Sequence, residues 1–308
     1  AISGATADEM KRLSDEAKRM GATTQFTAVE AGKALEYMAM AGWKTDQMLG
    51  GLPGIMNLAA ASGEDLGQVS DIVTDALTAF NMTADQAGRF ADVLAQASSN
   101  SNTNVAMMGA TFQKVAPVAG ALGYSVEDVS LAIGLMANAS IKSEVAGTSL
   151  KTALANMAKP TKQMKEYMDK YGISLTNADG SMKSFREVVD NLRSSLGGLS
   201  ETEQVAAATA IFGKESFAGM LAIVNASEAD FQKLSDSVNN SAGAAERMAQ
   251  IKLDNFQGKV TLLQSAVEGL QIALGDALLP TFTEGAEKAA ELISKLTEFI
   301  NANPELVR

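Results

Sequence analysis

The acidic pairs Glu64–Asp65 and Glu127–Asp128 are the residues of this sequence most suited to acid–base chemistry. Two carboxylates that flank a glycosidic bond can hydrolyse it, one as the acid and the other as nucleophile or base. Each pair stands at the start of a predicted helix, where acids stabilise the positive end of the helix dipole. Capping therefore explains both pairs without catalysis, and a catalytic pair formed between distant residues can be recognised only in a structure.

Other chemistry has few candidates in the 308 residues. Cys and His are absent, which removes the thiol nucleophile and the commonest general base and metal ligand. The Gly-Lys pairs at 32–33, 213–214 and 258–259 lack the following Ser or Thr of a phosphate loop. Asn177 and Asp179 lack the Glu that completes a calcium loop, so turn chemistry is the better interpretation. We expect no enzyme activity, no cofactor and no metal site.

The charge of the chain also excludes a class of partner. The formal net charge is -11, and a grip on nucleic-acid phosphates needs basic patches, so no direct nucleic-acid binding is expected. No stretch of about 20 apolar residues is free of charge, so no segment is expected to span a membrane. The start Ala1–Gly4 has no feature of a signal peptide and is expected to be an internal cut.

Helix signals position nearly all of these residues. Capping boxes pair Ser or Thr with Glu or Gln three residues later at Thr6, Thr27, Thr83, Ser184 and Ser200. Glycines are predicted to end helices at Gly21, Gly42, Gly63, Gly123, Gly172 and Gly213. The expected helices are 7–20, 27–41, 45–61, 65–80, 84–99, 104–122, 126–140, 145–158, 161–171, 184–196, 201–212, 214–224 and 227–240. Pro117 should kink or break its helix.

A degenerate repeat runs through the first part of the chain. Turns at 42–46, 81–85 and 123–127 each place a Gly or Asn, a bulky apolar residue, a Thr or Ser and an acid in similar order. The period is about 40 residues, typical of one helix pair per unit. Trp43, the only Trp, lies in the first of these turns, where it either covers the hairpin core or is an exposed anchor for a partner.

A long helix is predicted from Ala244 to Leu279, with a last amphipathic helix at 283–302 after Pro280. Its apolar residues follow an unbroken 3-4 spacing, which is a heptad seam that another surface must cover. The seam is Leu253, Phe256, Val260, Leu263, Val267, Leu270 and Leu274. We expect the preceding helices to cover it in a monomer, and the helix at 283–302 to fold back at Pro280 and present Ala289, Leu292, Ile293, Leu296, Phe299 and Ile300 on one side.

The expected fold class is all-α: a multi-helix bundle of stacked helical hairpins with one short β-hairpin and the long C-terminal helix. The hairpin is predicted at 173–183, where Asp179–Gly180 separates two short alternating runs. The expected division is a hairpin-repeat region at 1–172, a β-hairpin with short helices at 173–242, and the heptad and amphipathic helices at 243–308.

Several strings in order resemble the core region of tail tape measure proteins of tailed phages and prophages. They are Phe26–Ala31, Met38–Trp43, Leu58–Leu66, Phe90–Ala95, Ile141–Lys151 and Ile211–Ser216. The resemblance covers residues from about 10 to 280. It implies a structural protein whose characteristic residues, Gly42, Gly147, Thr148 and Gly213, are architectural.

The resemblance also implies a role and partners. A tape measure protein occupies the lumen of the tail tube, sets tail length, and leaves ahead of the DNA. The implied partners are the tail tube protein, tail assembly chaperones and distal tail proteins, with contact to the host membrane during ejection. Location would be the virion tail, and the host cytoplasm during assembly. The seam adds self-association as a coiled coil between copies.

Three other functions stay open at this point. A membrane-active or pore-forming protein would use the amphipathic helices at 244–279 and 283–302, although their polar faces are not basic. A cell-wall hydrolase would clear peptidoglycan, and a helical adaptor would bind a partner inside the cell. A compact bundle of this size would not lie in a narrow tube lumen as a thin rod. We therefore expect this segment to have a compact state and, in the mature tail, an extended state.

Overall fold

The computed structural model describes residues 4–302, apart from the side chains of Phe256, 280–282, 284–286, Ala289, Leu296 and 299–302. Nearly all of this part is helical. The first helices are α1 (Ala7–Thr23), α2 (Ala28–Met40), α3 (Thr45–Ser62), α4 (Leu66–Ala79), the 3-10 turn η1 (Ala84–Gln86), α5 (Ala87–Ser99), α6 (Val105–Ala121), α7 (Val126–Asn138) and α8 (Ser143–Ala158). The rest are α9 (Lys162–Tyr171), α10 (Phe185–Leu196), α11 (Glu201–Phe212), α12 (Phe217–Val224), α13 (Glu228–Asn239), α14 (Ala244–Leu253) and α15 (Phe256–Ala302).

The predicted caps form the helix ends. Thr6, Thr27, Ser184 and Ser200 each accept from the backbone N–H three residues on, and the Glu at that position accepts from the capping residue in return. Gly42, Gly63, Gly123, Gly172 and Gly213 all have positive φ, which glycine adopts without a steric cost. Local sequence therefore determines where most of these helices begin and end.

The three repeated turns share one geometry. The backbone N–H groups of Trp43, Met82 and Tyr124 each donate to the carbonyl oxygen five residues earlier, at 3.0, 2.8 and 3.0 Å. The residue before each of them, Gly42, Asn81 or Gly123, has positive φ. This is the Schellman arrangement, which satisfies the last carbonyls of a helix and turns the chain. The stacked helical hairpins expected from the repeat are therefore present.

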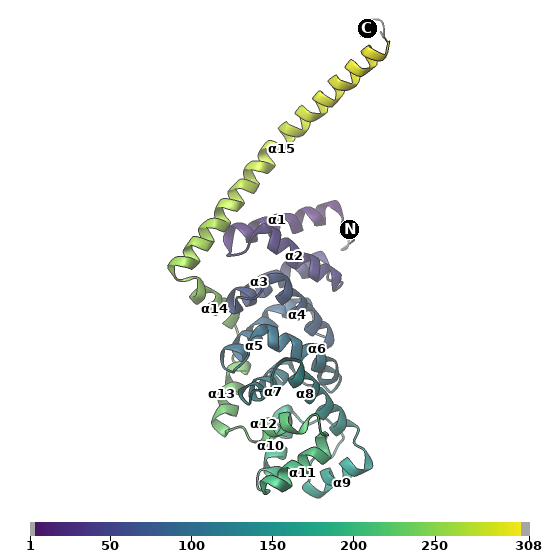
Figure 1. Ribbon diagram of the computed structural model, residues 1–308, viewed down its shortest axis with the longest axis vertical. Helices are drawn as coiled ribbons and strands as arrows, with labels where there is room; N and C mark the ends of the chain where they lie inside the picture. Colours follow the sequence, from purple (N-terminus) through teal and green to yellow (C-terminus); the bar gives the residue numbers. More distant parts are fainter. Residues whose placement is uncertain (1–3, 303–308) are drawn as a thin grey trace.

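The hairpins stack into a column made of two rows of helices (Figure 1). In one row α2, α4, α6 and α8 pack in succession, and in the other α3, α5 and α7 do so. Phe112 of α6 joins the layers, because its ring lies edge-on to Phe80 at 5.9 Å and to Phe90 at 5.5 Å between ring centroids. The core is continuous along the column rather than divided between units.

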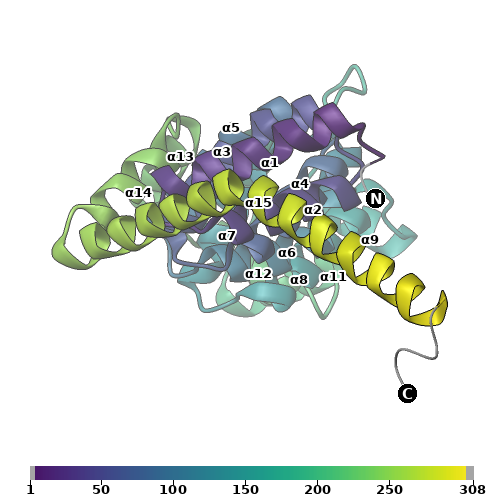
Figure 2. The same cartoon turned by 90° about the horizontal axis from the view of Figure 1, so that it is seen from above.

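After α12 the chain returns along the side of the column. α13 packs on α7 and α5, α14 packs on α5 and α3, and α15 reaches α1 at the end of the column where the chain began. Seen along the column, α15 crosses over α1 and then leaves the body (Figure 2). The return places the last helix beside the first.

Asp92 of α5 fixes this return. Its carboxylate accepts from the backbone N–H of Gly243 at 2.7 Å and of Ala245 at 2.9 Å, so it caps α14 from a position about 150 residues earlier. A carboxylate at a helix N-terminus satisfies free N–H groups and the dipole together. We expect Asp92→Ala to lower the free energy of unfolding by about 1–3 kcal/mol in urea denaturation. Asp85→Ala, at an exposed acid in η1, is the matched control and should change it little; equal effects would refute the cap.

Two local predictions are wrong. Gly21 does not end a helix: α1 continues to Thr23, and Gly21 is buried where a Cβ would lie 2.4 Å from the backbone nitrogen of Ala28, so the glycine serves close helix packing. The predicted β-hairpin is also absent from the described residues, which hold only one isolated antiparallel bridge, Thr176 with Met182. Most residues of this loop are exposed, and a two-stranded hairpin is marginal in water. Pro117 lies inside α6, which continues to Ala121.

The C-terminal prediction is corrected at three points. The helix from Ala244 is interrupted at 254–255, between α14 and α15. α15 then runs through position 280 to Ala302, so the separate helix at 283–302 does not form and does not fold back. A proline removes one backbone hydrogen bond, and water can satisfy the freed carbonyl on a helix that projects from the body. The predicted face with Ala289, Leu296, Phe299 and Ile300 lies outside the described side chains, whereas Leu292 and Ile293 are exposed.

Candidate functional site

α15 meets the body through a narrow face of small residues. Ser265 is buried, Ile272 is half-buried, and a Cβ at Gly269 would lie 2.8 Å from the Cβ of Ala22 in α1. An ion pair between Lys18 of α1 and Asp276 lies at the outer end of this contact. Gly269 allows the two helices to approach closely at the centre of this contact, and Ile272 packs beside it.

The heptad seam lies on the opposite side of α15. Leu263, Val267, Leu270 and Leu274 are 64, 45, 59 and 55% exposed. With about 100° of rotation per residue, the mean direction of these residues is roughly 160° from that of the α1-facing residues. The expectation that the chain covers its own seam is therefore wrong: docking through the small residues turns the leucines outward. Leu253 and Val260 are half-buried near the joint, and the side chain of Phe256 is outside the described ones.

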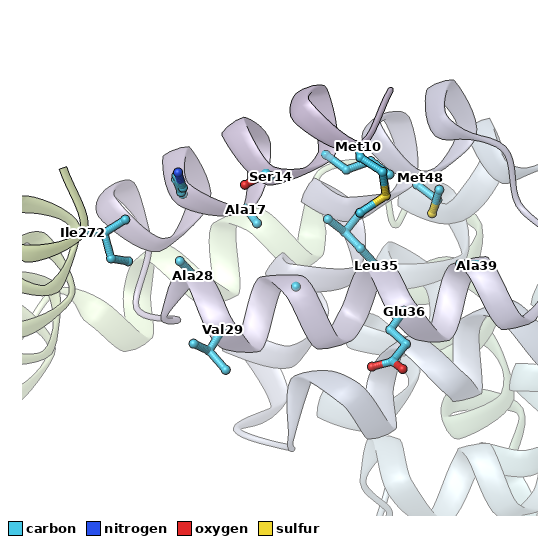
Figure 3. Close-up of a pocket in the computed structure, with 13 residues that line it drawn as sticks. Met10, Ser14, Ala17, Ala28, Val29, Leu35, Glu36, Ala39, Met48 and Ile272 are labelled. Carbon is cyan, nitrogen blue, oxygen red and sulfur yellow. The ribbon is translucent and has the colours of Figure 1, made fainter. Parts of the chain in front are cut away.

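An apolar groove opens between α1 and α2 beside this contact (Figure 3). Its volume is about 540 Å³, Met48 of α3 lies at its floor, and Ile272 of α15 closes one end. Apolar side chains at its mouth, such as Met10 and Val29, are exposed. The groove has the shape and chemistry that accept the apolar face of a helix. The sequence does not predict this groove, because it forms between two amphipathic helices and the pattern of each helix does not show how far apart the two lie.

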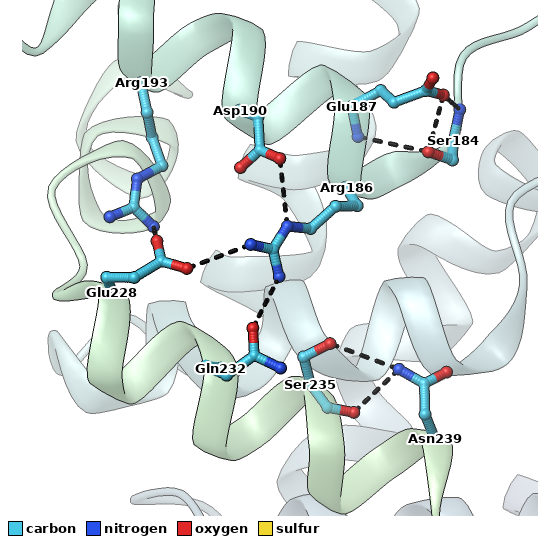
Figure 4. A network of polar contacts seen from close by, with 9 residues as sticks. All are labelled: Ser184, Arg186, Glu187, Asp190, Arg193, Glu228, Gln232, Ser235 and Asn239. Carbon is cyan, nitrogen blue, oxygen red and sulfur yellow. Dashed lines mark hydrogen bonds and ion pairs between the residues drawn. The ribbon is translucent and has the colours of Figure 1, made fainter.

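At the other end of the column, charged side chains join α10 to α13 (Figure 4). Arg186 contacts Asp190 and Glu228 at 3.1 Å each, and Arg193 contacts Glu228 at 3.3 Å. The guanidinium of Arg186 also lies 4.4 Å from the ring centroid of Phe231. Arg186 and Arg193 both lie over the buried ring of Phe231, and this packing joins α10 to α13, while the exposed ion pairs add little. The contact is structural.

The acidic pairs considered for catalysis act in capping and in an ion pair. Asp65 accepts from the backbone N–H of Gln68 at 3.0 Å, and Asp128 accepts from that of Ser125 at 3.0 Å. Glu127 pairs with Arg89 at 2.7 Å. Burial raises the pKa of the Tyr124 hydroxyl to about 12, with the charge of Asp128 as a second cause. Among the side chains that the structure describes, no group of three or more His, Cys, Asp or Glu could hold a metal ion.

The architectural candidates lie apart from one another. Gly42 and Gly213 stand at helix ends with positive φ, and Trp43 is buried against Gly51. Gly147 is buried where α8 meets α6, and Thr148 is exposed beside it. The structure brings none of these together with the seam. A Cβ at Gly51 would lie 2.5 Å from the Trp43 ring, so this glycine lets Trp43 pack closely on α3.

In the part of the chain that the structure describes, no helix is both long and apolar enough to cross a bilayer. This finding does not favour the pore-forming alternative.

Known proteins resemble this chain over almost its whole length. The family of phage-related minor tail proteins matches residues 14–213. The tape measure protein of Pneumococcus phage Dp-1 is 37% identical over 305 residues, which is 99% of this chain and 26% of that protein. The probable tape measure protein of Escherichia phage P2 is 24% identical over 97% of this chain and 37% of that protein.

A third relative, the probable tape measure protein of Halomonas phage phiHAP-1, is 25% identical over 81% of this chain and 30% of its own length. The chain thus spans well under half the length of the curated relatives it matches. No solved structure matches it.

Proposed function

Because this chain belongs to the phage-related minor tail protein family, we propose that it is a structural segment of a tape measure protein that scaffolds tail tube assembly and sets tail length. The observation that carries the proposal is the match of 99% of the chain to the tape measure protein of a phage. The whole protein then lies in the tail tube of the virion, is present in the host cytoplasm during assembly, and leaves with the passage of DNA.

The helical architecture supports a structural rather than an enzymatic role. Of the acids considered for catalysis, Asp65 and Asp128 cap helices and Glu127 forms an ion pair, and the groove between α1 and α2 is lined mainly by apolar side chains. The partners that fit this role are the tail tube protein, tail assembly chaperones and distal tail proteins, with host membrane contact during ejection. The three-part division at 1–172, 173–242 and 243–308 and the architectural role of Gly42, Trp43, Gly147, Thr148 and Gly213 belong to the same proposal.

The exposed seam supports self-association of the tape. Leucines and a valine at heptad spacing are stable in water when a second helix covers them, and two or more copies of α15 do so as a coiled coil. The compact column and an extended tape then correspond to two states of the segment, of which the extended state occupies the narrow lumen.

Duplication of α15 in the phage genome tests the length role. An in-frame second copy of its 47 residues should lengthen the tail by about 70 Å, at 1.5 Å per helical residue, as measured by electron microscopy of purified virions. In-frame insertion of only half as many residues is the matched counterpart and should lengthen the tail by about half as much, with the seam left in place. Tails of unchanged length in both phages would show that this segment does not act as a ruler.

A further inference from the structure

The joint between α14 and α15 interrupts a pattern that continues through it. Leu253, Phe256 and Val260 keep the 3-4 spacing of the seam across the break at 254–255. No proline lies between the two helices. The apolar spacing alone is therefore compatible with one continuous helix from Ala244. The bend depends on the cap that Asn255 forms at the start of α15 and on the contacts of α14 and α15 with different parts of the body.

The contacts that hold the bend itself are few and exposed. The side chain of Asn255 donates to the carbonyl oxygen of Lys252 at 2.6 Å and accepts from the backbone N–H of Gly258 at 2.8 Å. Lys259 pairs with Asp254 at 3.3 Å, with both side chains largely exposed. A cavity of about 390 Å³ also lies at the joint. Exposed polar contacts stabilise weakly, so the bend is a loosely packed hinge.

Gly258 makes the bend possible. A Cβ at this position would lie 2.3 Å from the carbonyl oxygen of Leu253 and 2.6 Å from its Cα. In a continuous helix, a residue five positions earlier lies about 7.5 Å back along the axis, which removes this clash. A side chain at 258 therefore opposes the bent joint and not the straight one.

The surface of α1 that α15 covers fits α15 at two points. The close approach of Gly269 to Ala22 and the ion pair of Lys18 with Asp276 are contacts between two helix surfaces. α15 follows α14 through the hinge alone, so α15 of another copy can make the same contacts on α1. Exchange of an identical element through a hinge costs little, because every native contact is regained.

We propose that the α1 surface beneath α15 is an interface between copies of this chain, on which α15 of a second copy replaces the chain's own α15 when the joint at 254–258 straightens. Two chains that exchange α15 in this way form a closed twofold dimer. The leucine seam, on the opposite side of α15, stays exposed in that dimer and is a separate surface.

Chemical cross-linking distinguishes exchange from other association. The chain has no Cys, so one batch carries Lys18→Cys alone and the other Asp276→Cys alone. A short bis-maleimide joins the two batches only if α15 of one chain lies on α1 of the other. The chain with both substitutions is the control, since it should cross-link within itself at low concentration. One batch carries an added tag that changes its mass, so that dimers of one tagged and one untagged chain are resolved on denaturing gels over a dilution series.

Glycine substitutions in these chains should raise or lower the fraction of cross-linked dimer in predictable ways. Gly258→Ala should raise the cross-linked dimer fraction roughly tenfold, as expected when overpacking disfavours the bent state. Gly275→Ala is the matched control, because a Cβ there meets nothing within 4 Å. Gly269→Ala should reduce the cross-link between chains and within one chain, while circular dichroism shows that the helices of the column persist.

Three results would overturn the exchange. The first is cross-linking within the double variant but none between the single variants, with or without Gly258→Ala. The second is an equal rise for Gly258→Ala and Gly275→Ala. The third is that copies associate without forming the 18–276 cross-link, and that Leu263→Asp abolishes this association. That result would place the contact between copies on the seam instead.

Discussion

A phage whose tape measure protein carries Leu263→Asp and Leu270→Asp should assemble no functional tails, while the purified chain keeps its fold. Both leucines are more than half exposed and face away from α1, so the column loses no packing when they change. Buried carboxylates in a coiled-coil core would be desolvated beside like charges, which excludes association. We expect infectious titre to fall by several orders of magnitude, with helix content and urea midpoint of the purified chain nearly unchanged.

The matched control adds the same charges outside the seam. Gln264 and Gln271 are exposed on α15 but do not belong to the apolar spacing, so Gln264→Asp and Gln271→Asp should leave tails intact. Normal tails in the leucine variant would show that the seam has no role in assembly. Loss of helix content in that variant would show instead that the seam packs within the chain, as expected from sequence alone before the structure placed it outside.

The success of sequence reasoning follows from how local the relevant forces are. Helix ends at Thr27, Ser184 or Gly63 depend on side chains and backbone within a few residues, so the capping pattern predicts them. The turn at Asn81 was also recognised as a repeat of the turn at Gly42, because both need a residue that tolerates positive φ. All-helical stacking follows from these short-range rules.

Two of the errors come from contacts between helices, which local capping rules and apolar spacing do not predict. Gly21 looks like a helix stop, yet packing against Ala28 places it inside α1. The apolar spacing through Leu253 and Phe256 predicts one helix, but Asp92 anchors α14 to α5 while α15 lies on α1, and the chain bends between them. An apolar stripe shows that a surface needs cover without showing what covers it.

The face of α15 that contacts α1 is a further feature that the sequence did not reveal. Sequence reasoning selected the seam by its large residues, whereas the face that docks on α1 consists of Ser265, Gly269 and Ile272. Small residues at 3-4 spacing are a signal for close helix packing, and that signal was available in the sequence. It was weaker than the leucine pattern because small residues are common on exposed helices as well.

Gly147→Val should strongly destabilise the column. α6 and α8 form its most extensive helix contact, and a Cβ at Gly147 would lie 2.8 Å from both the carbonyl oxygen of Thr111 and the Cβ of Lys114. Backbone atoms cannot move aside as a flexible side chain can, so the helices must separate. The hydrogen bond from the Thr111 hydroxyl to the carbonyl of Ser143, 2.8 Å long, is then strained as well. We expect about 3 kcal/mol lower stability in urea denaturation.

Gly50→Val separates this steric effect from the change in helix preference. Gly50 also lies within a helix, and a Cβ there meets nothing within 4 Å, so the same substitution should be neutral or slightly stabilising because valine favours the helix more than glycine. Thr148→Val tests the neighbouring position, which is exposed and should tolerate the change. If the Gly147→Val and Gly50→Val chains have equal free energies of unfolding, Gly147 is not an architectural residue. Its presence in the motif Ile141–Lys151 would then need another explanation, such as contact with other tail proteins. If only Gly147→Val greatly lowers the free energy of unfolding, the motif Ile141–Lys151 is where α8 packs tightly on α6. The motif then maintains the packing of the column and not a reactive group.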